Sequence, residues 1–360
     1  MRRRVLKDLD RWRSEGEGVA VATLVRVSGS APRLVGARLA LTVSGRMSGS
    51  VSGGCVESDV MDRALGILDS GKAELVTYGI LDDDEMGVGM HCGEIEVLIQ
   101  PDMAAPVSRA LSLALDEERQ AVLATRLSPG RGLGLQMVVT ASGPTGSLGD
   151  GVDEGVKARA VELLGGAAEA GVESFAGTDG SVEVFVEVFA RRPRLFIVGA
   201  THTAVPLCLL AGQLGFHVTV VDARRVFATE ERFAGADEIL KLWPDEAFGP
   251  DVLGQDSYVV TLTHDSKFDV PALACALNSE ACYIGAMGSR TTHARRVEKL
   301  RERGFGDDDL SRIHAPVGLD IGARGPEEIA LAILAEMLAV RSRRRGGPLS
   351  QREAGIHDED

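Results

Sequence analysis

The segment that follows residue 194 constrains the fold most, because short apolar runs alternate there with helical stretches. LFIVGA at 195–200 is an apolar run that ends in glycine, which is typical of a strand buried on both faces. An apolar helical pattern follows at Thr203–Leu214, and then comes HVTVVD, which ends at Asp222. This alternation predicts an α/β fold with a doubly wound parallel sheet.

The same alternation continues toward the C-terminus. Two further strand–helix pairs are expected at Ser257–Thr263 with Val270–Leu277 and at Ala281–Gly285 with Ser289–Arg303. A last helix is expected at Pro326–Val340, since proline and two glutamates suit its first turn. Residues 191–343 are therefore predicted to form a Rossmann-like C-terminal domain. Residues 344–360 are polar and charge-blocked, which predicts a disordered tail.

The first half of the chain contains one pattern twice. Strand-like runs at Val19–Val27 and Arg38–Val43, a helix at Val56–Ser70 and a strand at Glu94–Gln100 are echoed about 85–100 residues later. The echoes are expected at Gln120–Arg126, Gln136–Ala141, Val152–Ala168 and GSVEVFVEV. Residues 1–190 are therefore predicted to form an N-terminal α+β domain built by a degenerate duplication, although β-rich segments with glycine turns can resemble each other by chance.

The two copies differ at two turns. The first copy carries Cys55 and Cys92, where the second copy has Gly151 and Asp179. Both cysteines therefore lie in one copy, which is what a site added to a scaffold would look like. The alternative is that each is a small buried apolar residue, the commonest role of a free cysteine.

Composition excludes several classes of protein. The formal charge of −14 argues against nucleic acid or an anionic membrane as a partner. No apolar run of about 20 residues is present, so no membrane span is expected. The N-terminus is basic but lacks an apolar signal-peptide core, and the five cysteines are too scattered for a disulfide framework. We therefore expect a cytoplasmic protein.

The first turn of the second half resembles a dinucleotide-binding fingerprint only in part. Gly199 and Ala204 are in place, but Thr201 replaces the middle glycine that lets the backbone approach a diphosphate. His202 lies in the same turn, and Asp222 is placed to bind a ribose hydroxyl. The pattern supports the fold but makes NAD(P) an unlikely ligand.

Other turns at the strand ends also offer polar side chains. Gly285, Gly288, Ser289 and Arg290 form a glycine-rich turn into a helix N-terminus, which suits an anion unless Ser289 merely caps the helix. A second turn contains a neighbouring His–Asp pair that could act as acid and base or could be structural; its members are His264 and Asp265.

Two loops complete the set of candidate sites. A constrained loop able to fold over a ligand contains His314, Gly318, Asp320 and Arg324. The first-half loop with Gly53 and Gly54 places Cys55 near a helix N-terminus, where the dipole favours a thiolate, a nucleophile and soft-metal ligand. Cys55, Cys92 and His91 are too few for a closed zinc site.

Long strings at these turns resemble the XdhC/CoxI family. The strings GSAPRLVGARLALTVSGRMSGSVSGGCVES, GVGMHCGEIEVLIQP, YIGAMGSRTTHARR and IHAPVGLDIGARGPEEIALAILAEMLA carry the resemblance, which spans most of the chain except the middle segment and the tail. The turn GATH departs from the family's usual GAGH, which further weakens a dinucleotide role.

The resemblance implies a cofactor chaperone rather than a purine-oxidising enzyme. Such proteins bind molybdenum cofactor transiently, assist its sulfuration with a cysteine desulfurase-type donor, and deliver it to an apo molybdenum hydroxylase. Pterin phosphate is then expected near Gly288–Arg290 under the loop His314–Arg324, with Cys55, or else Cys92, approaching the molybdenum or its incoming sulfur.

Two alternatives stay open at this point. One is an NAD(P)-dependent oxidoreductase that uses Asp222 and the pair His264/Asp265. The other is an adaptor that joins sulfurase and apo-enzyme without holding cofactor. A homodimer would let one chain's cysteines meet the other chain's turns.

Overall fold

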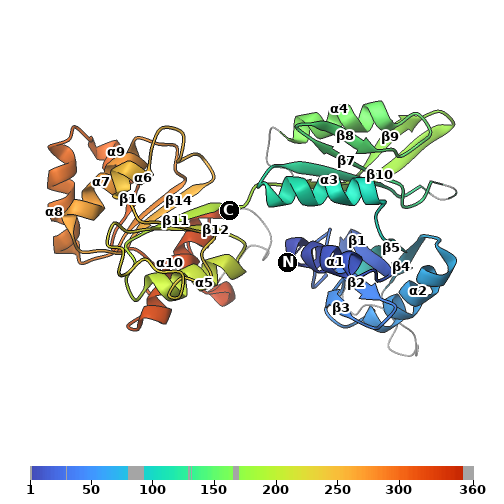
Figure 1. The fold of residues 1–360 in the computed structure, drawn as a ribbon, viewed down its shortest axis with the longest axis horizontal. Helices are drawn as coiled ribbons and strands as arrows, with labels where there is room; N and C mark the ends of the chain where they lie inside the picture. The colour runs from blue at the N-terminus through green and yellow to red at the C-terminus, as the bar shows by residue number, and fades with distance from the viewer. Residues whose placement is uncertain are drawn as a thin grey trace. The chain divides into compact units, whose positions relative to one another are not determined.

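The protein divides into two compact units, Met1–Arg191 and Arg192–Asp360 (Figure 1). The computed structural model describes residues 2–29, 31–79, 93–128, 130, 132–164 and 170–351. Within the described residues, no helix combines the length and the apolar character that a membrane crossing requires.

The first unit contains one arrangement of elements twice. The first copy consists of α1(Arg2–Ser14), β1(Val19–Gly29), β2(Arg38–Thr42), β3(Met47–Gly49), α2(Glu57–Ser70), β4(Glu74–Tyr78) and β5(Gly93–Pro101). The second copy consists of α3(Ala105–Asp116), β6(Ala121–Arg126), β7(Gln136–Thr140), β8(Gly143–Gly146), α4(Asp153–Leu163), β9(Gly171–Gly177) and β10(Gly180–Phe189). The strand orders β3-β2-β1-β5-β4 and β8-β7-β6-β10-β9 are the same, which confirms the duplication.

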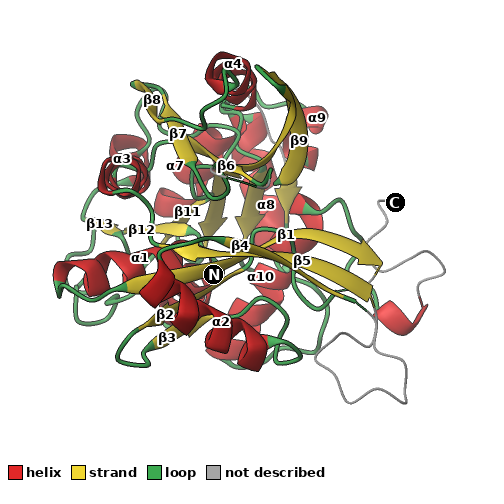
Figure 2. Ribbon diagram, turned by 90° about the vertical axis from the view of Figure 1, so that its right-hand side faces the viewer, coloured by secondary structure: helices red, strands yellow, loops and turns green. Residues whose placement is uncertain are grey.

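Period-two patterning explains how each antiparallel sheet is buried (Figure 2). On β1, Ala20, Ala22 and Leu24 pack with α2, while Val19 and Val21 face a core shared with α1 and α3. Alternate residues of β6 likewise pack with α4 or into that shared core. The two copies are therefore joined by one apolar layer within the unit.

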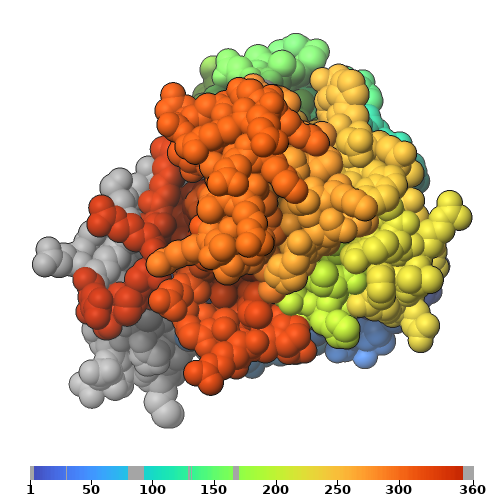
Figure 3. Space-filling model, turned by 90° about the vertical axis from the view of Figure 1, so that its left-hand side faces the viewer, coloured from blue at the N-terminus to red at the C-terminus, as the bar shows by residue number. Residues whose placement is uncertain are grey.

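The second unit is a six-stranded parallel sheet with helices on both faces, as the strand–helix alternation predicts. Its elements are β11(Arg194–Val198), α5(Ala204–Gln213), β12(His217–Val221), β13(Glu238–Leu240), α6(Pro244–Ala247), β14(Ser257–Thr261), α7(Ser266–Leu277), β15(Tyr283–Ala286), α8(Arg290–Arg301), α9(Asp307–Ser311), β16(Ile313–His314), α10(Pro326–Arg341) and the 3₁₀ helix η1(Leu349–Gln351). Helices α5 and α10 cover one face, and α7, α8 and α9 cover the other. The side drawn in Figure 3 shows in orange the part of the chain that contains α8 and α9.

Some boundaries differ from the sequence predictions. Helix α7 begins at Ser266 rather than Val270, because the side chain of Asp265 caps it. Helix α4 ends at Leu163, and residues 165–169 lie outside the described residues. Helices α1 and α3 were not predicted. In the segment predicted to be a disordered tail, η1 is helical, and residues 352–360 lie outside the described residues.

Candidate functional site

A cavity lies at the carboxyl edge of the parallel sheet, where the strand order reverses. The order β13-β12-β11-β14-β15-β16 places the reversal between β11 and β14, which is where open α/β sheets bind ligands. The cavity has a volume of about 690 Å³, a size typical of small-molecule sites. Its lining residues are Thr201, His202, Thr203, Arg224, Leu262, Thr263, His264, Asp265, Ser266 and Met287.

Gly199 lets two loops of this cavity approach each other closely. Its φ is +104°, and a Cβ atom there would lie 2.3 Å from Cγ2 of Thr263 on the loop after β14. A side chain at residue 199 would therefore separate the turn after β11 from its neighbour. The packing of these two loops therefore requires glycine at residue 199. The role of Gly199 in cofactor binding stays a prediction.

The sequence predicted that Asp222 binds a ribose hydroxyl, which requires a free carboxylate oxygen. Asp222 has no free oxygen. It is fully buried, and each of its oxygens accepts two hydrogen bonds. Their donors are the backbone N–H groups of Ala200 and Arg224 and the Arg224 guanidinium, at 2.7–2.9 Å. Burial raises the pKa of Asp222, but these hydrogen bonds outweigh burial and hold that pKa below its ordinary value. A carboxylate has about four acceptor positions, so none is left for a hydroxyl.

Arg224 brings a positive charge into the cavity, and sequence analysis missed it. Its guanidinium pairs with Asp222 and lies 4.9 Å from the ring centroid of Phe227 and 5.0 Å from that of Phe268. The side chain remains 41% exposed, and hydrogen bonding to Asp222 raises its pKa. The signal in the sequence was an arginine two residues after the aspartate that ends a strand.

The His264/Asp265 pair is in the cavity, but Asp265 has a structural task. Its carboxylate accepts the backbone N–H of Lys267 at 2.9 Å and so caps α7. Both side chains are exposed, and no hydrogen bond joins them in the described part of the chain. The loop is fixed instead by the buried pair Asp269–Arg296, since Arg296 also donates to the carbonyl of Thr263 at 3.1 Å.

The glycine-rich turn after β15 borders the cavity only through Met287. Ser289 caps α8 by accepting the N–H of Thr292 at 3.2 Å, which is the structural role considered for it. Gly285 is required because a Cβ atom there would lie 2.6 Å from Val317. Gly288 has a φ of +136°, and Arg290 is exposed and does not line the cavity.

The loop after β16 is held against its own unit by Glu336 of α10. The Glu336 carboxylate accepts the hydroxyl of Tyr283 and, at 2.9 Å, the N–H of Gly318. His314 stacks on Tyr283 with a centroid distance of 4.7 Å, and its Nδ1 lies 3.6 Å from Glu336.

The other members of this loop stand apart from the cavity. Gly318, with φ of +104°, packs against Ala332 of α10. Asp320 and Arg324 are exposed, and no residue of the loop lines the cavity.

In the first unit, the loop before α2 encloses a carboxylate of its own. Glu57 accepts the backbone N–H groups of Val51, Ser52, Gly53 and Gly54 at 2.8–3.1 Å. It also accepts the hydroxyls of Ser50 and Ser52. Burial raises the pKa of Glu57, but these donors lower it to about 2.

Cys55 is exposed at the tip of this loop, two residues before α2. Glu57 occupies the N–H groups of residues 51–54, which precede Cys55 in the loop, whereas the first turn of α2 follows it. That the helix dipole favours a Cys55 thiolate stays a prediction. Cys92 and His91 lie outside the described residues. Elsewhere in the described ranges, no three His, Cys, Asp or Glu side chains are grouped as metal ligands.

The second copy repeats this loop without the cysteine. Asp153 accepts the N–H of Leu148 at 2.8 Å and the hydroxyl of Ser147 at 2.6 Å, as Glu57 does in the first copy. Gly151 stands where Cys55 stands in the first copy. The loop therefore folds without a cysteine, so Cys55 is not required for its shape.

The fold and the cavity define a class: a duplicated α+β unit followed by a Rossmann unit with an open cavity at its switch point. Family models match at two places, "XdhC and CoxI family" at residues 12–79 and "XdhC Rossmann domain" at residues 195–337. The chain belongs to the XdhC and CoxI family.

Three proteins are similar to this chain over most of its length. A Bacillus subtilis protein named as a probable xanthine dehydrogenase component is 29% identical over 93% of this chain and 97% of that protein. The molybdenum cofactor insertion chaperone PaoD of Escherichia coli is 27% identical over 91% of this chain and 84% of its own. A crystal structure from Bacillus halodurans, described as a xanthine dehydrogenase, has a TM-score of 0.74 at 27% identity and covers 96% of this chain and 98% of its own.

Proposed function

We propose that this protein binds molybdenum cofactor transiently and delivers it to a xanthine dehydrogenase-type enzyme. The observation that carries the proposal is the similarity to a molybdenum cofactor insertion chaperone along 91% of the chain. The cavity at the switch point supports it, because a volume of about 690 Å³ with mixed polar and apolar walls suits a pterin-sized ligand. The saturated carboxylate of Asp222 weakens one of the observations that had favoured a dinucleotide-dependent oxidoreductase, the acid placed to bind a ribose hydroxyl.

We propose further that Cys55 approaches the molybdenum or its incoming sulfur during sulfuration by a cysteine desulfurase-type donor. Its exposure at the tip of a loop that Glu57 holds by hydrogen bonds supports this role, as does its replacement by Gly151 in the copy that shares the same fold. A thiol placed on an ordered loop is accessible to a large partner without unfolding of the scaffold.

The test is anaerobic mixing of the purified protein with molybdenum cofactor, followed by gel filtration and measurement of pterin per chain. We expect near-stoichiometric retention. Absence of retention, under conditions in which a known carrier retains cofactor, would overturn cofactor binding.

The role of Cys55 is tested by maturation of apo-enzyme. Cys55→Ala should retain its fold by circular dichroism but lose delivery of active cofactor. Cys282→Ala, which alters another exposed free cysteine, is the matched control and should deliver normally. Normal maturation by Cys55→Ala would contradict the proposed role of this thiol.

A further inference from the structure

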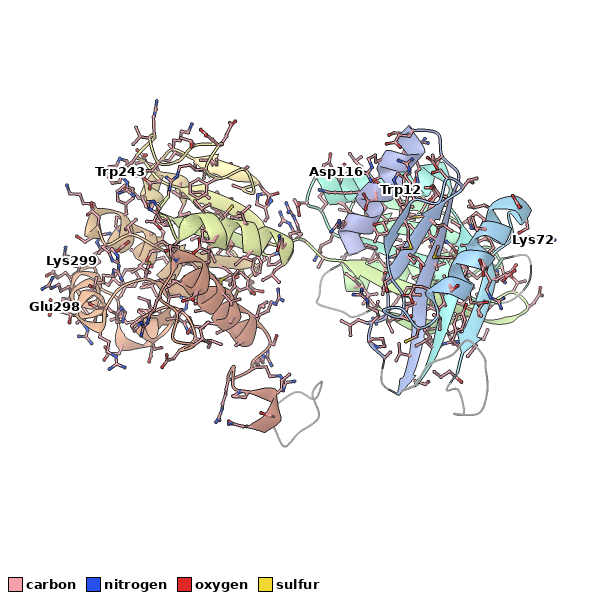
Figure 4. All side chains as sticks on the ribbon, turned by 90° about the horizontal axis from the view of Figure 1, so that it is seen from below. Trp12, Lys72, Asp116, Trp243, Glu298 and Lys299 are labelled. Atoms are coloured by element: carbon pink, nitrogen blue, oxygen red, sulfur yellow. The ribbon has the colours of Figure 1, made fainter. Side chains whose placement is uncertain are left out.

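Arg224 differs from every other residue of the cavity wall in carrying a fixed positive charge. It is the one Lys or Arg side chain among the lining residues that the structure describes. Its guanidinium is held from one side by Asp222 and lies against the rings of Phe227 and Phe268. The ring of Phe268 in turn stacks on the ring of Trp243, with 4.6 Å between their centroids. Trp243 is labelled in Figure 4. An arginine held in this way loses little side-chain freedom when it binds a ligand.

The pairing with Asp222 leaves part of the guanidinium unused. Nε and Nη2 donate to the aspartate, whereas Nη1 donates to no protein atom in the described residues. A guanidinium has five N–H groups, so at least the two on Nη1 remain for a ligand. Guanidinium donors match the oxygens of phosphate in distance and direction.

Two further features at this end of the cavity suit an anion. Helix α5, ten residues long, begins at Ala204, directly after the lining residues Thr201–Thr203. The N-terminus of a helix carries partial positive charge and N–H groups with no partner in the helix. In addition, Thr201 lines the cavity, and its buried Oγ1 has no hydrogen-bond partner in the described structure.

Asp265 adds a negative charge to the cavity wall, opposite in sign to that of Arg224. One of its oxygens caps α7 through Lys267, and the N-terminus of α7 compensates its charge. Its remaining acceptor positions suit ligand N–H groups, and the edge of a pterin ring that carries its amino group presents N–H groups of this kind. The cavity wall thus offers both donors, on Arg224, and an acceptor, on Asp265.

We infer that Arg224 binds the terminal phosphate of a pterin ligand and that Asp265 binds the N–H edge of its ring. The identity of the ligand rests on the proposed function. The turn Gly288–Arg290, where the sequence had placed the phosphate, is less suited to it, because the Ser289 side chain already accepts the N–H of Thr292 and Arg290 lies outside the cavity wall.

The experiment compares binding of two fluorescent probes, the oxidised pterin of molybdenum cofactor with its phosphate and the same pterin after phosphatase treatment. The full-length wild type should bind the phosphorylated probe about 10- to 100-fold more tightly. Arg224→Gln should abolish this preference. Arg224→Lys, which keeps a cation beside Asp222, should lose part of it, since an ammonium group lacks the planar fork.

Matched variants separate a specific contact from a general change in charge. Arg225→Gln removes a neighbouring exposed arginine and should keep the full preference. Asp265→Asn, which can still cap α7, should weaken both probes by the same factor. Thermal unfolding of every variant confirms that the fold is intact.

Each outcome bears on one part of the inference. If both Arg224 variants discriminate like wild type, or if Arg290→Gln loses the preference instead, the phosphate assignment is overturned. Unchanged affinities in Asp265→Asn overturn the ring assignment. If the wild type retains intact cofactor in gel filtration but does not prefer the phosphorylated probe, this inference is overturned and the proposed function stands. Absence of pterin binding, with inorganic pyrophosphate still stabilising wild type but not Arg224→Gln, keeps the anion site and overturns the proposed function.

Discussion

At the scale of single residues, the carboxylate of Glu57 binds the backbone of the loop that presents Cys55. Four backbone N–H groups and two hydroxyls surround its carboxylate. Glu57→Gln removes the charge that these donors bind, and we expect it to lower the free energy of unfolding at pH 7 by about 1–2 kcal/mol. Urea unfolding followed by circular dichroism measures this change.

The pKa of Glu57 also fixes the pH dependence of this effect. Its folded value of about 2 lies below the ordinary value of 4.5, so the ionised carboxylate stabilises the fold above pH 4.5. That contribution is lost as the pH falls toward 2, and the difference between wild type and Glu57→Gln should therefore shrink at pH 3. Glu154→Gln, at an 86% exposed side chain in the first turn of α4, is the control. An equal loss in the two variants at pH 7 would contradict the proposed role of Glu57.

At the scale of elements, the buried pair Asp269–Arg296 joins α7 to α8 beneath the cavity loop. Both side chains are at most 3% exposed, and burial raises the pKa of Asp269 although Thr263 and Arg296 lower it. Arg296→Met leaves a buried carboxylate without its partner, and we expect a loss of about 3–5 kcal/mol in the free energy of unfolding. Chemical denaturation of the full-length protein provides the measurement.

Two comparisons test that this loss comes from the unpaired charge. The double variant Asp269→Leu/Arg296→Met should recover much of the lost stability, because no charge then remains buried. Arg301→Gln, also on α8, breaks the exposed pair with Asp307 of α9 and should cost less than about 1 kcal/mol. A double variant as unstable as Arg296→Met would show that packing, rather than charge, determines the loss.

The elements also show what the sequence could and could not predict. The parallel sheet was predictable, because strands buried on both faces are continuous apolar runs separated by helical patterns. Helix α1 was missed, although Val5, Leu6, Leu9 and Trp12 have helical spacing and are buried. The contact of Arg224 with Phe268 could not be predicted, since Phe268 is distant in sequence and approaches Arg224 only when α7 packs in the folded unit.

At the scale of the whole molecule, each unit has its own core. Every buried apolar cluster among the described residues lies entirely within residues 1–191 or within residues 192–351. Units with separate cores can in general fold alone. We therefore expect fragments 1–191 and 192–360 each to unfold cooperatively when expressed separately, as monitored by circular dichroism during urea denaturation.

The two copies inside the first unit should behave differently, although their topology is the same. Their sheets share a core with α1 and α3, and the buried ion pair between Arg38 of β2 and Glu187 of β10 crosses from one copy to the other. A fragment that ends at residue 103 would expose this apolar layer and leave Arg38 without its carboxylate, at a cost of several kcal/mol. We expect it to be unfolded or self-associated in gel filtration, in contrast to 1–191. A cooperative, monomeric fragment 1–103 would mean that the duplicated copy, and not the pair, is the folding unit.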